Sequence, residues 1–311
     1  MHKSAFLLLG AAVVLASSGD RLPEFRQCVE HCIESECEDK PPVLLRLLLW
    51  TCQSNCDYLC QQRLTHSHLN SNSRVHQYHG KWPFIRVLGV QEPASVVFSL
   101  LNLVPNWIGY KRLQRARVTG VQRTLLPYYL LFAVIGVNTW VWSSVFHVRD
   151  FVLTERLDYF SAILSIVYGL FLALTRLFRL DLPHNRNKLK MVAAILGLFY
   201  LGHISYLSLI HFDYGYNMAA GVVLGLIQNS LWVTLGIKLY RQTKSTTDLL
   251  PAILVVLIMG GMSFELFDFS PFGLVFDAHS LWHLSTVLPT AMWYQFMLHD
   301  LNRSSKSVKL I

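Results

Sequence analysis

Residues 127–146 read PYYLLFAVIGVNTWVWSSVF, a predominantly apolar stretch without a charged side chain. A transmembrane helix needs about 20 predominantly apolar residues, because it rises about 1.5 Å per residue and must cross about 30 Å of hydrocarbon. The stretch therefore predicts one membrane-spanning helix.

Six further apolar blocks lie on either side of this one. The seven predicted spans are 93–110, 127–146, 159–178, 189–210, 217–237, 250–267 and 280–298. The composition agrees, because 53% of the 311 residues are hydrophobic, only 15% are charged, and the mean hydropathy is +0.37. These values favour an all-α membrane protein, a seven-transmembrane helix bundle, over a soluble domain.

The basic residues show how the bundle should be oriented. Lysine and arginine gather in alternate connections, at 111–123, 176–190, 238–244 and 303–309, whereas the connections between them are neutral or acidic. The net charge of +8 is therefore spread over short loops and does not predict a nucleic-acid partner. Positive loops stay in the cytosol, so we expect a lumenal N-terminal segment and a cytosolic C-terminus.

The N-terminus resembles a signal peptide. Lys3 precedes an apolar run, 5–16, which is short for a span, and the small residues Ala16, Ser17 and Ser18 suit a cleavage site. The predicted organisation is a signal peptide (1–18), a cysteine-rich lumenal domain (19–90), a seven-transmembrane domain (91–299) and a cytosolic tail (300–311).

All six cysteines lie in the second of these segments. They are Cys28, Cys32, Cys37, Cys52, Cys56 and Cys60. An even number behind a signal peptide predicts three disulfide bonds in an oxidising compartment, and a zinc cluster is the rival interpretation. Several spacings of four place cysteines on one helical face, which suggests two short helices stapled together. Six cysteines allow about 15 pairings, so the connectivity stays open.

Five polar residues fall at the lumenal ends of the predicted spans. Ser143 and His147 are four apart in the second span, Asp158 opens the third, and His279 and His283 are four apart in the seventh. Ionisable groups are costly in a membrane and indicate function, and residues four apart share a helix face. Three imidazoles could bind one zinc ion and leave a fourth position for water, whose pKa would fall to about 7. Asp158 would then serve as general base and Ser143 as hydrogen-bond donor.

Other ionisable residues suggest structural roles. A pair of histidines four apart recurs by chance, so the pair alone would favour packing; the set of five at one depth favours a metal site. We expect packing or interfacial roles for His203 and His211. Glu92 either caps the first span or braces the site. Three acidic residues are expected to be solvated loop charges: Glu265, Asp268 and Asp277.

Several longer motifs resemble one protein family. The matching stretches are 79–84 (HGKWPF), 91–95 (QEPAS), 142–147 (WSSVFH) with 149–150, 158–160 (DYF), 203–210, 212–217 (FDYGYN), 277–279 and 282–283. They are similar to the Per1-like GPI-anchor lipid-remodelling proteins, that is, post-GPI-attachment-to-proteins factor 3 and its yeast relatives. The likeness covers nearly the whole mature chain, including the cysteine pattern.

The resemblance implies a fold, a cofactor and a substrate. The family is similar to a wider superfamily of seven-helix hydrolases that includes alkaline ceramidases and adiponectin receptors. By that likeness His147, His279 and His283 would bind one catalytic Zn²⁺, and Asp158 and Ser143 would serve the bound water. The substrate would be the GPI anchor of attached proteins, from which a phospholipase A2-type hydrolase removes the unsaturated sn-2 acyl chain. The location would be the Golgi membrane, with the ER as the alternative.

Two other functions remain open at this point. A ceramidase-like amidase could use the same metal centre, because water can attack either an ester or an amide. A receptor or chaperone for GPI-anchored proteins would need no lipid chemistry, and any metal would then be structural. The oligomeric state is not predicted.

Overall fold

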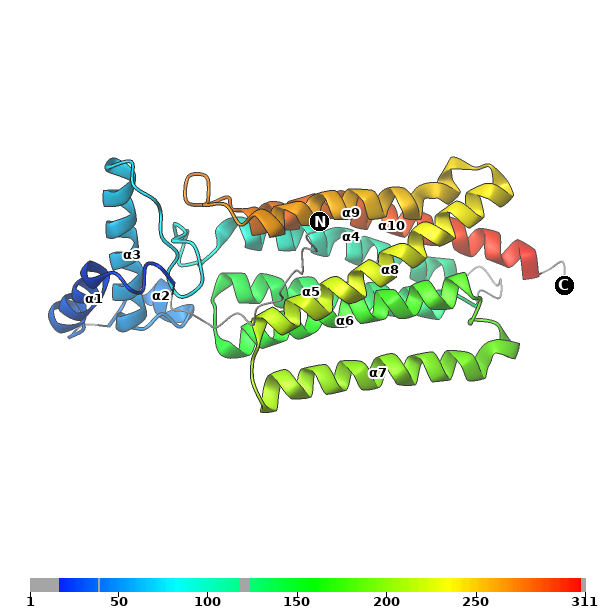
Figure 1. Cartoon of the computed structure of the whole chain (residues 1–311), viewed down its shortest axis with the longest axis horizontal. Helices are drawn as coiled ribbons and strands as arrows, with labels where there is room; N and C mark the ends of the chain where they lie inside the picture. Colours follow the sequence, from blue (N-terminus) through cyan, green and yellow to red (C-terminus); the bar gives the residue numbers. More distant parts are fainter. Residues whose placement is uncertain (1–16, 39, 118–123, 309–311) are drawn as a thin grey trace, which may run out of the picture.

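The computed structural model describes residues 17–38, 40–117 and 124–308, and within them the chain is helical, without a β-strand. The predicted signal peptide, 1–18, lies outside these residues apart from Ser17 and Ser18. Three short helices form an N-terminal domain and seven long helices form a bundle (Figure 1).

The N-terminal domain is a hairpin of two helices. Its elements are α1 (Pro23–Glu36), α2 (Val43–Leu47) and α3 (Cys52–Asn70). Pro23 suits the first turn of α1, where its missing N–H costs nothing. Thr51 and Ser54 form a capping box that satisfies backbone N–H groups at the start of α3. Helices α1 and α3 pack against each other.

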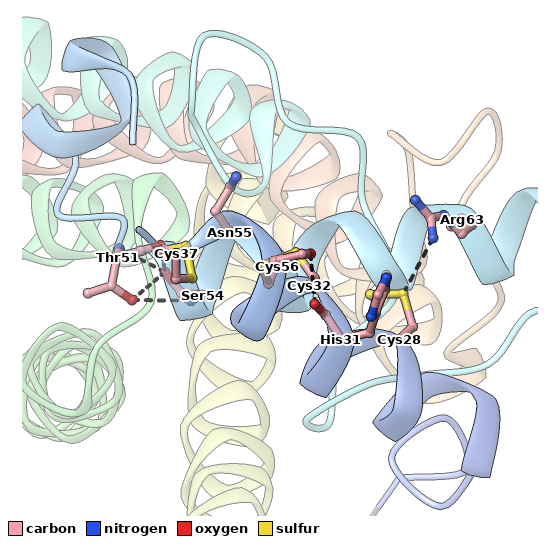
Figure 2. The surroundings of a disulfide bond; sticks show 12 residues. Cys28, His31, Cys32, Cys37, Thr51, Ser54, Asn55, Cys56 and Arg63 are labelled. Carbon is pink, nitrogen blue, oxygen red and sulfur yellow. Dashed lines mark hydrogen bonds between the residues drawn. A yellow bond between two sulfur atoms is a disulfide. The ribbon is translucent and has the colours of Figure 1, made fainter. Parts of the chain in front are cut away.

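Three disulfide bonds join α1 and its end to α3 (Figure 2). The pairs are Cys28–Cys60, Cys32–Cys56 and Cys37–Cys52. The residue numbers of the cysteines rise along α1 and its end while those of their partners fall along α3, so the three bonds are nested and the two helices are antiparallel. Their Cα–Cα separations of 5.9, 5.7 and 5.5 Å suit unstrained bridges. The disulfide prediction is confirmed, and the rival zinc cluster is excluded because no described cysteine is free. We call α1–α3 the disulfide domain.

The bundle begins after a linker, residues 71–92. Its helices are α4 (Pro93–Arg117), α5 (Leu126–Val148), α6 (Val152–Leu177), α7 (Arg186–Leu209), α8 (Tyr214–Thr243), α9 (Leu250–Phe267) and α10 (Ala278–Val308), with 3₁₀ turns η1 (Pro183–Asn185) and η2 (Thr246–Leu249). Helix α4 packs against α5 and α10, α6 packs against α5, α7 and α8, and α9 packs against α8 and α10. Figure 1 shows the disulfide domain at one end of the bundle and α7 at its periphery.

Among the described residues, five helices are long and apolar enough to cross a membrane: α5, α6, α7 with η1, α8, and α9 with η2. The chain is therefore a membrane protein. In α7 only 11% of the most apolar stretch is buried, so its apolar side chains face outward, as they would toward lipid. Each predicted block falls on one long helix, and for α9 the bounds coincide with 250–267.

Helices α4 and α10 are less apolar because they share a polar seam. Asn102 Nδ2 donates to the backbone carbonyl of His283 at 2.7 Å, and Tyr294 OH donates to Asn106 Oδ1 at 2.7 Å. A Cβ at Gly136 would overlap the Asn106 side chain, so the glycine lets α5 approach this seam. Helix α10 also continues to Val308, so the predicted tail, 300–311, begins as helix.

Candidate metal centre

Three histidines meet at the bundle end that carries the disulfide domain, which we call the histidine end. His147 lies in the last turn of α5, and His279 and His283 lie one turn apart at the start of α10. One ring nitrogen of each lies within 4.8 Å of the others. His147 and His283 are buried and His279 is partly exposed, so the group lies at the edge of the bundle interior.

Local capping places these rings. Asp277 Oδ1 accepts from the Ser280 backbone N–H at 2.9 Å, and Ser280 Oγ accepts from the Asp277 backbone N–H at 3.0 Å. This reciprocal cap fixes the first turn of α10, from which both histidines project. The backbone N–H of Glu92 donates to the carbonyl of His147 at 3.0 Å. The start of α4 is thereby held against the end of α5.

Each imidazole is oriented through its Nδ1 atom. Glu92 Oε2 lies 2.7 Å from Nδ1 of His147, and Glu265 Oε2 lies 2.7 Å from Nδ1 of His279. Ser99 Oγ lies 3.0 Å from Nδ1 of His283. A carboxylate can only accept, so Glu92 and Glu265 favour a proton on Nδ1 and leave Nε2 of His147 and His279 as the electron-pair donor, which is the usual arrangement around a bound metal. The Ser99 hydroxyl can accept from Nδ1 of His283 in the same way.

The Nε2 atom of His147 is buried and has no hydrogen-bond partner. A buried polar atom without a partner costs about 1–3 kcal/mol, so native proteins rarely leave one without a reason. Glu92 already occupies Nδ1 of His147, so the unpartnered Nε2 is the nitrogen that His147 offers to the three-histidine group. The donor set therefore fits one zinc ion held by three nitrogens with a fourth position open.

The other two predicted residues lie beside the histidines. Ser143 is buried one turn before His147, and its Oγ lies 3.0 Å from Ser99 Oγ, which in turn contacts His283. Asp158 lies near the start of α6, where it interacts electrostatically with His147 and His279. The five residues chosen from sequence thus share one end of the bundle, and Ser143 is linked to the histidines through Ser99.

The structure corrects the expected roles of two acidic residues near this site and adds a serine that the sequence did not indicate. The interpretation of Glu265 as a solvated charge is wrong, because its half-buried carboxylate holds His279. Asp277 is also buried, as the cap of α10. Glu92 braces the site, which was one of its two expected roles. Ser99 was not predicted, since nothing distinguishes a single serine within an apolar block.

Two other expectations hold. His203 is buried and packs in the bundle, with Nε2 2.9 Å from Asn217 Oδ1, and His211 is exposed beyond the end of α7.

Asp268 is bound to the linker, because its carboxylate accepts from Trp82 Nε1 at 2.9 Å and from Gln77 Nε2 at 3.0 Å. Asp268 is exposed in the loop after α9, as expected of a solvated loop charge, and it also tethers the linker.

An ion-pair network connects the linker to this site. Lys81 Nζ lies 2.6 Å from Glu92 Oε1 and 2.9 Å from Asp150 Oδ2. Burial acts to lower the pKa of Lys81, but the carboxylates of Glu92 and Asp150 outweigh it and raise the pKa above its usual value. Lys81 therefore stays charged and fixes the carboxylate that orients His147.

The family of this chain follows from comparison with known proteins. The Per1-like family matches residues 42–301. The chain belongs to the Per1-like family. Among its relatives, "Protein PER1 homolog" of Schizosaccharomyces pombe is 40% identical over 95% of this chain and 92% of that protein. "GPI-specific phospholipase A2-like PGAP3" is 39% identical in Mus musculus, over 94% of this chain and 93% of that protein, and 38% identical in Homo sapiens, over 94% and 92%. The predicted family is confirmed, and the Per1-like match includes all five candidate site residues.

Proposed function

We propose that this Per1-like protein is a metal-dependent acyl ester hydrolase that removes the unsaturated sn-2 fatty acid from the GPI anchors of proteins. One observation carries the proposal: three histidines converge at the histidine end, each with Nδ1 engaged and with the buried His147 Nε2 lacking a partner. The names of the relatives supply the substrate, because several are called GPI-specific phospholipase A2-like.

The cofactor in this proposal is one Zn²⁺ held by His147, His279 and His283. Zinc when bound supplies a Lewis acid that activates water at neutral pH. Glu92, Glu265 and Ser99 keep the three rings in the tautomer and orientation needed for binding.

The remaining chemistry falls to Asp158 and Ser143. The Asp158 carboxylate would accept a proton from the attacking water and deliver it to the glycerol oxygen that leaves, so the proton count balances. The Ser143 hydroxyl would donate a hydrogen bond to the oxyanion that forms from the ester carbonyl. Both groups lie next to the histidines on neighbouring helices.

The proposal also requires a particular placement in the membrane. Helices α4 and α10 would be the first and the seventh span, in addition to the five apolar helices, and the positive loops would then put the disulfide domain and the histidine end in the lumen and the C-terminus in the cytosol. The N-terminal signal peptide expected from the sequence and the oxidised cysteines suit this orientation. The compartment would be the Golgi or the ER, where GPI-anchored proteins and membrane lipid are the substrates.

The test is lipid analysis of a GPI-anchored reporter in cells that lack this protein. The wild-type protein should restore removal of the unsaturated sn-2 chain from the anchor of the reporter, and His279→Ala should not. His211→Ala is the matched control, because it removes an exposed histidine near the same end of the bundle. All variants must be equally abundant.

If His279→Ala also restores the lipid, the proposed chemistry is wrong and a receptor or chaperone role gains support. If ceramide rather than the GPI lipid changes, the amidase alternative replaces the esterase.

A further inference from the structure

A cavity of about 200 Å³ lies between the disulfide domain and the histidine end. Its walls come from α3, from the linker and from the turn between α5 and α6, so it exists only where the two parts of the molecule meet. The site chemistry described above does not use this space.

Two arginines and a tryptophan form one wall. The Arg86 guanidinium lies 3.6 Å from the Tyr58 ring centre and 4.2 Å from that of Trp50, and the Arg149 guanidinium lies 3.9 Å from Trp50. Arg86 Nη1 and Arg149 Nε are buried without hydrogen-bond partners. Guanidinium donors match phosphate oxygens, so two of them beside one cavity indicate an anionic ligand group.

The rest of the wall has a different character. Asp57 and Asp150 contribute carboxylates, and Trp82 contributes a further aromatic ring. Asp150 lies 2.9 Å from Lys81 Nζ and Asp57 lies 3.0 Å from His79 Nε2, so the carboxylates are partly neutralised by neighbours in the same wall. A ligand that bears a phosphate, an amine and hydroxyl groups would match every part of the wall. Glycosylphosphatidylinositol has this chemistry, because its phosphate joins an inositol that carries a glucosamine with a free amino group.

The position of the cavity relative to the histidines matches the same lipid. Lys81 lines the cavity, its Nζ lies 2.6 Å from Glu92, and the other oxygen of Glu92 lies 2.7 Å from His147 Nδ1. In a glycerophospholipid the phosphate and the sn-2 ester are on adjacent glycerol carbons. A phosphate held at the cavity would therefore bring the sn-2 ester to the histidine end.

We propose that this cavity binds the phosphoinositol glycan head of the lipid anchor, with the phosphate on Arg86 and Arg149 and the sugars against the aromatic rings. The proposal rests on the proposed function for the identity of the lipid. It assigns substrate selection to the joint between the disulfide domain and the bundle. A phospholipid without a glycan would leave most of the cavity contacts unmade.

Direct binding separates this proposal from catalysis. The probe is a water-soluble phosphoinositol glycan, with both fatty acids removed, titrated into purified full-length protein in detergent. Arg86→Gln and Arg149→Gln should each bind it about ten- to a hundredfold more weakly, because each removes charge-assisted hydrogen bonds. Arg63→Gln, at an exposed arginine of α3 outside the cavity, should bind as wild type does.

The outcomes of this titration distinguish failure of the cavity assignment from failure of the proposed function. His279→Ala should bind the glycan as wild type does. If the wild-type protein binds the glycan but hydrolyses no lipid, the proposed function is wrong and the cavity assignment stands. Equal binding by wild type, Arg86→Gln and Arg149→Gln overturns the cavity assignment. Inorganic phosphate that competes as strongly as the glycan would also overturn it, because the site would then be a simple anion site. If a glutamine variant fails to fold, Arg149→Lys keeps the charge, loses the planar fork and should still weaken binding.

Discussion

The two ends of the bundle each carry a buried polar group of residues, and the two groups differ in how completely they are satisfied. At the end opposite the histidines, Asp300 is fully buried and accepts two hydrogen bonds from Arg176, one from Tyr129 and one from Arg303, at 2.6–2.8 Å. At the histidine end, His147 Nε2 is buried and has no partner.

The difference separates a structural group from a functional one. Carboxylate oxygens saturated by protein donors have no capacity left for a ligand, so the Asp300 group fastens α10 to α5 and α6. Histidines held through one nitrogen keep the other available. Burial and charge alone would not have distinguished these groups, since both are polar and lie at the ends of the same helices.

The largest expected effect on stability comes from the saturated group. Asp300→Leu should lower the free energy of unfolding by about 3–5 kcal/mol, because it leaves the buried Arg176 charge without a partner. Thermal unfolding in detergent would measure the loss. Adding Arg176→Met should recover much of it. A double variant no more stable than the single one would show that the pair is not what stabilises this end.

An intermediate effect is expected from the groups that orient the histidines. Glu265→Gln should weaken metal binding about 10- to 100-fold, because the amide cannot replace the charged partner of His279 Nδ1. Metal titration of the chelator-treated protein would measure this. Glu155→Gln, at a partly buried carboxylate near the start of α6, is the control and should bind metal as wild type does. Equal loss in both variants would contradict an orienting role.

The smallest effect belongs to an exposed ion pair between His79 of the linker and Asp57 of the disulfide domain. The hydrogen bond with Asp57, with help from Asp20, raises the pKa of His79 above its ordinary value of 6.5. The stabilisation is therefore complete below about pH 6.5 and disappears as the pH rises through the raised pKa. His79→Gln should cost less than about 1 kcal/mol at pH 6 and less still at pH 9. Hydrogen exchange of linker amides would measure this stability cost. A cost that is larger at pH 9 than at pH 6 would contradict the raised pKa of His79.

The helices were predictable from sequence, but their ends were not. Apolar blocks locate the part of a helix that lies in hydrocarbon, whereas a helix continues as long as its backbone hydrogen bonds do. This is why α10 runs to Val308 although its apolar block ends at 298. The disulfide pairing was open for a different reason, since spacing shows which cysteines share a face but not which helix lies opposite.

The candidate site was predicted only in part. His279 and His283 were recognisable because they lie at the same depth as Ser143, His147 and Asp158 in an apolar setting, where charge is costly. Glu265 belongs to the preceding helix, and its partnership with His279 depends on how the loop between α9 and α10 folds back. Ser99 reaches His283 across a helix interface. Such contacts depend on packing between distant segments, which no local pattern encodes.

The most direct test of the account is the metal content of the purified protein. We predict about one zinc per wild-type chain, loss of zinc in His283→Ala, and full retention in Asp300→Leu combined with Arg176→Met, because the double variant leaves the three converging histidines unchanged. Zinc that stays at wild-type level in His283→Ala would contradict the claim that these histidines form the metal centre.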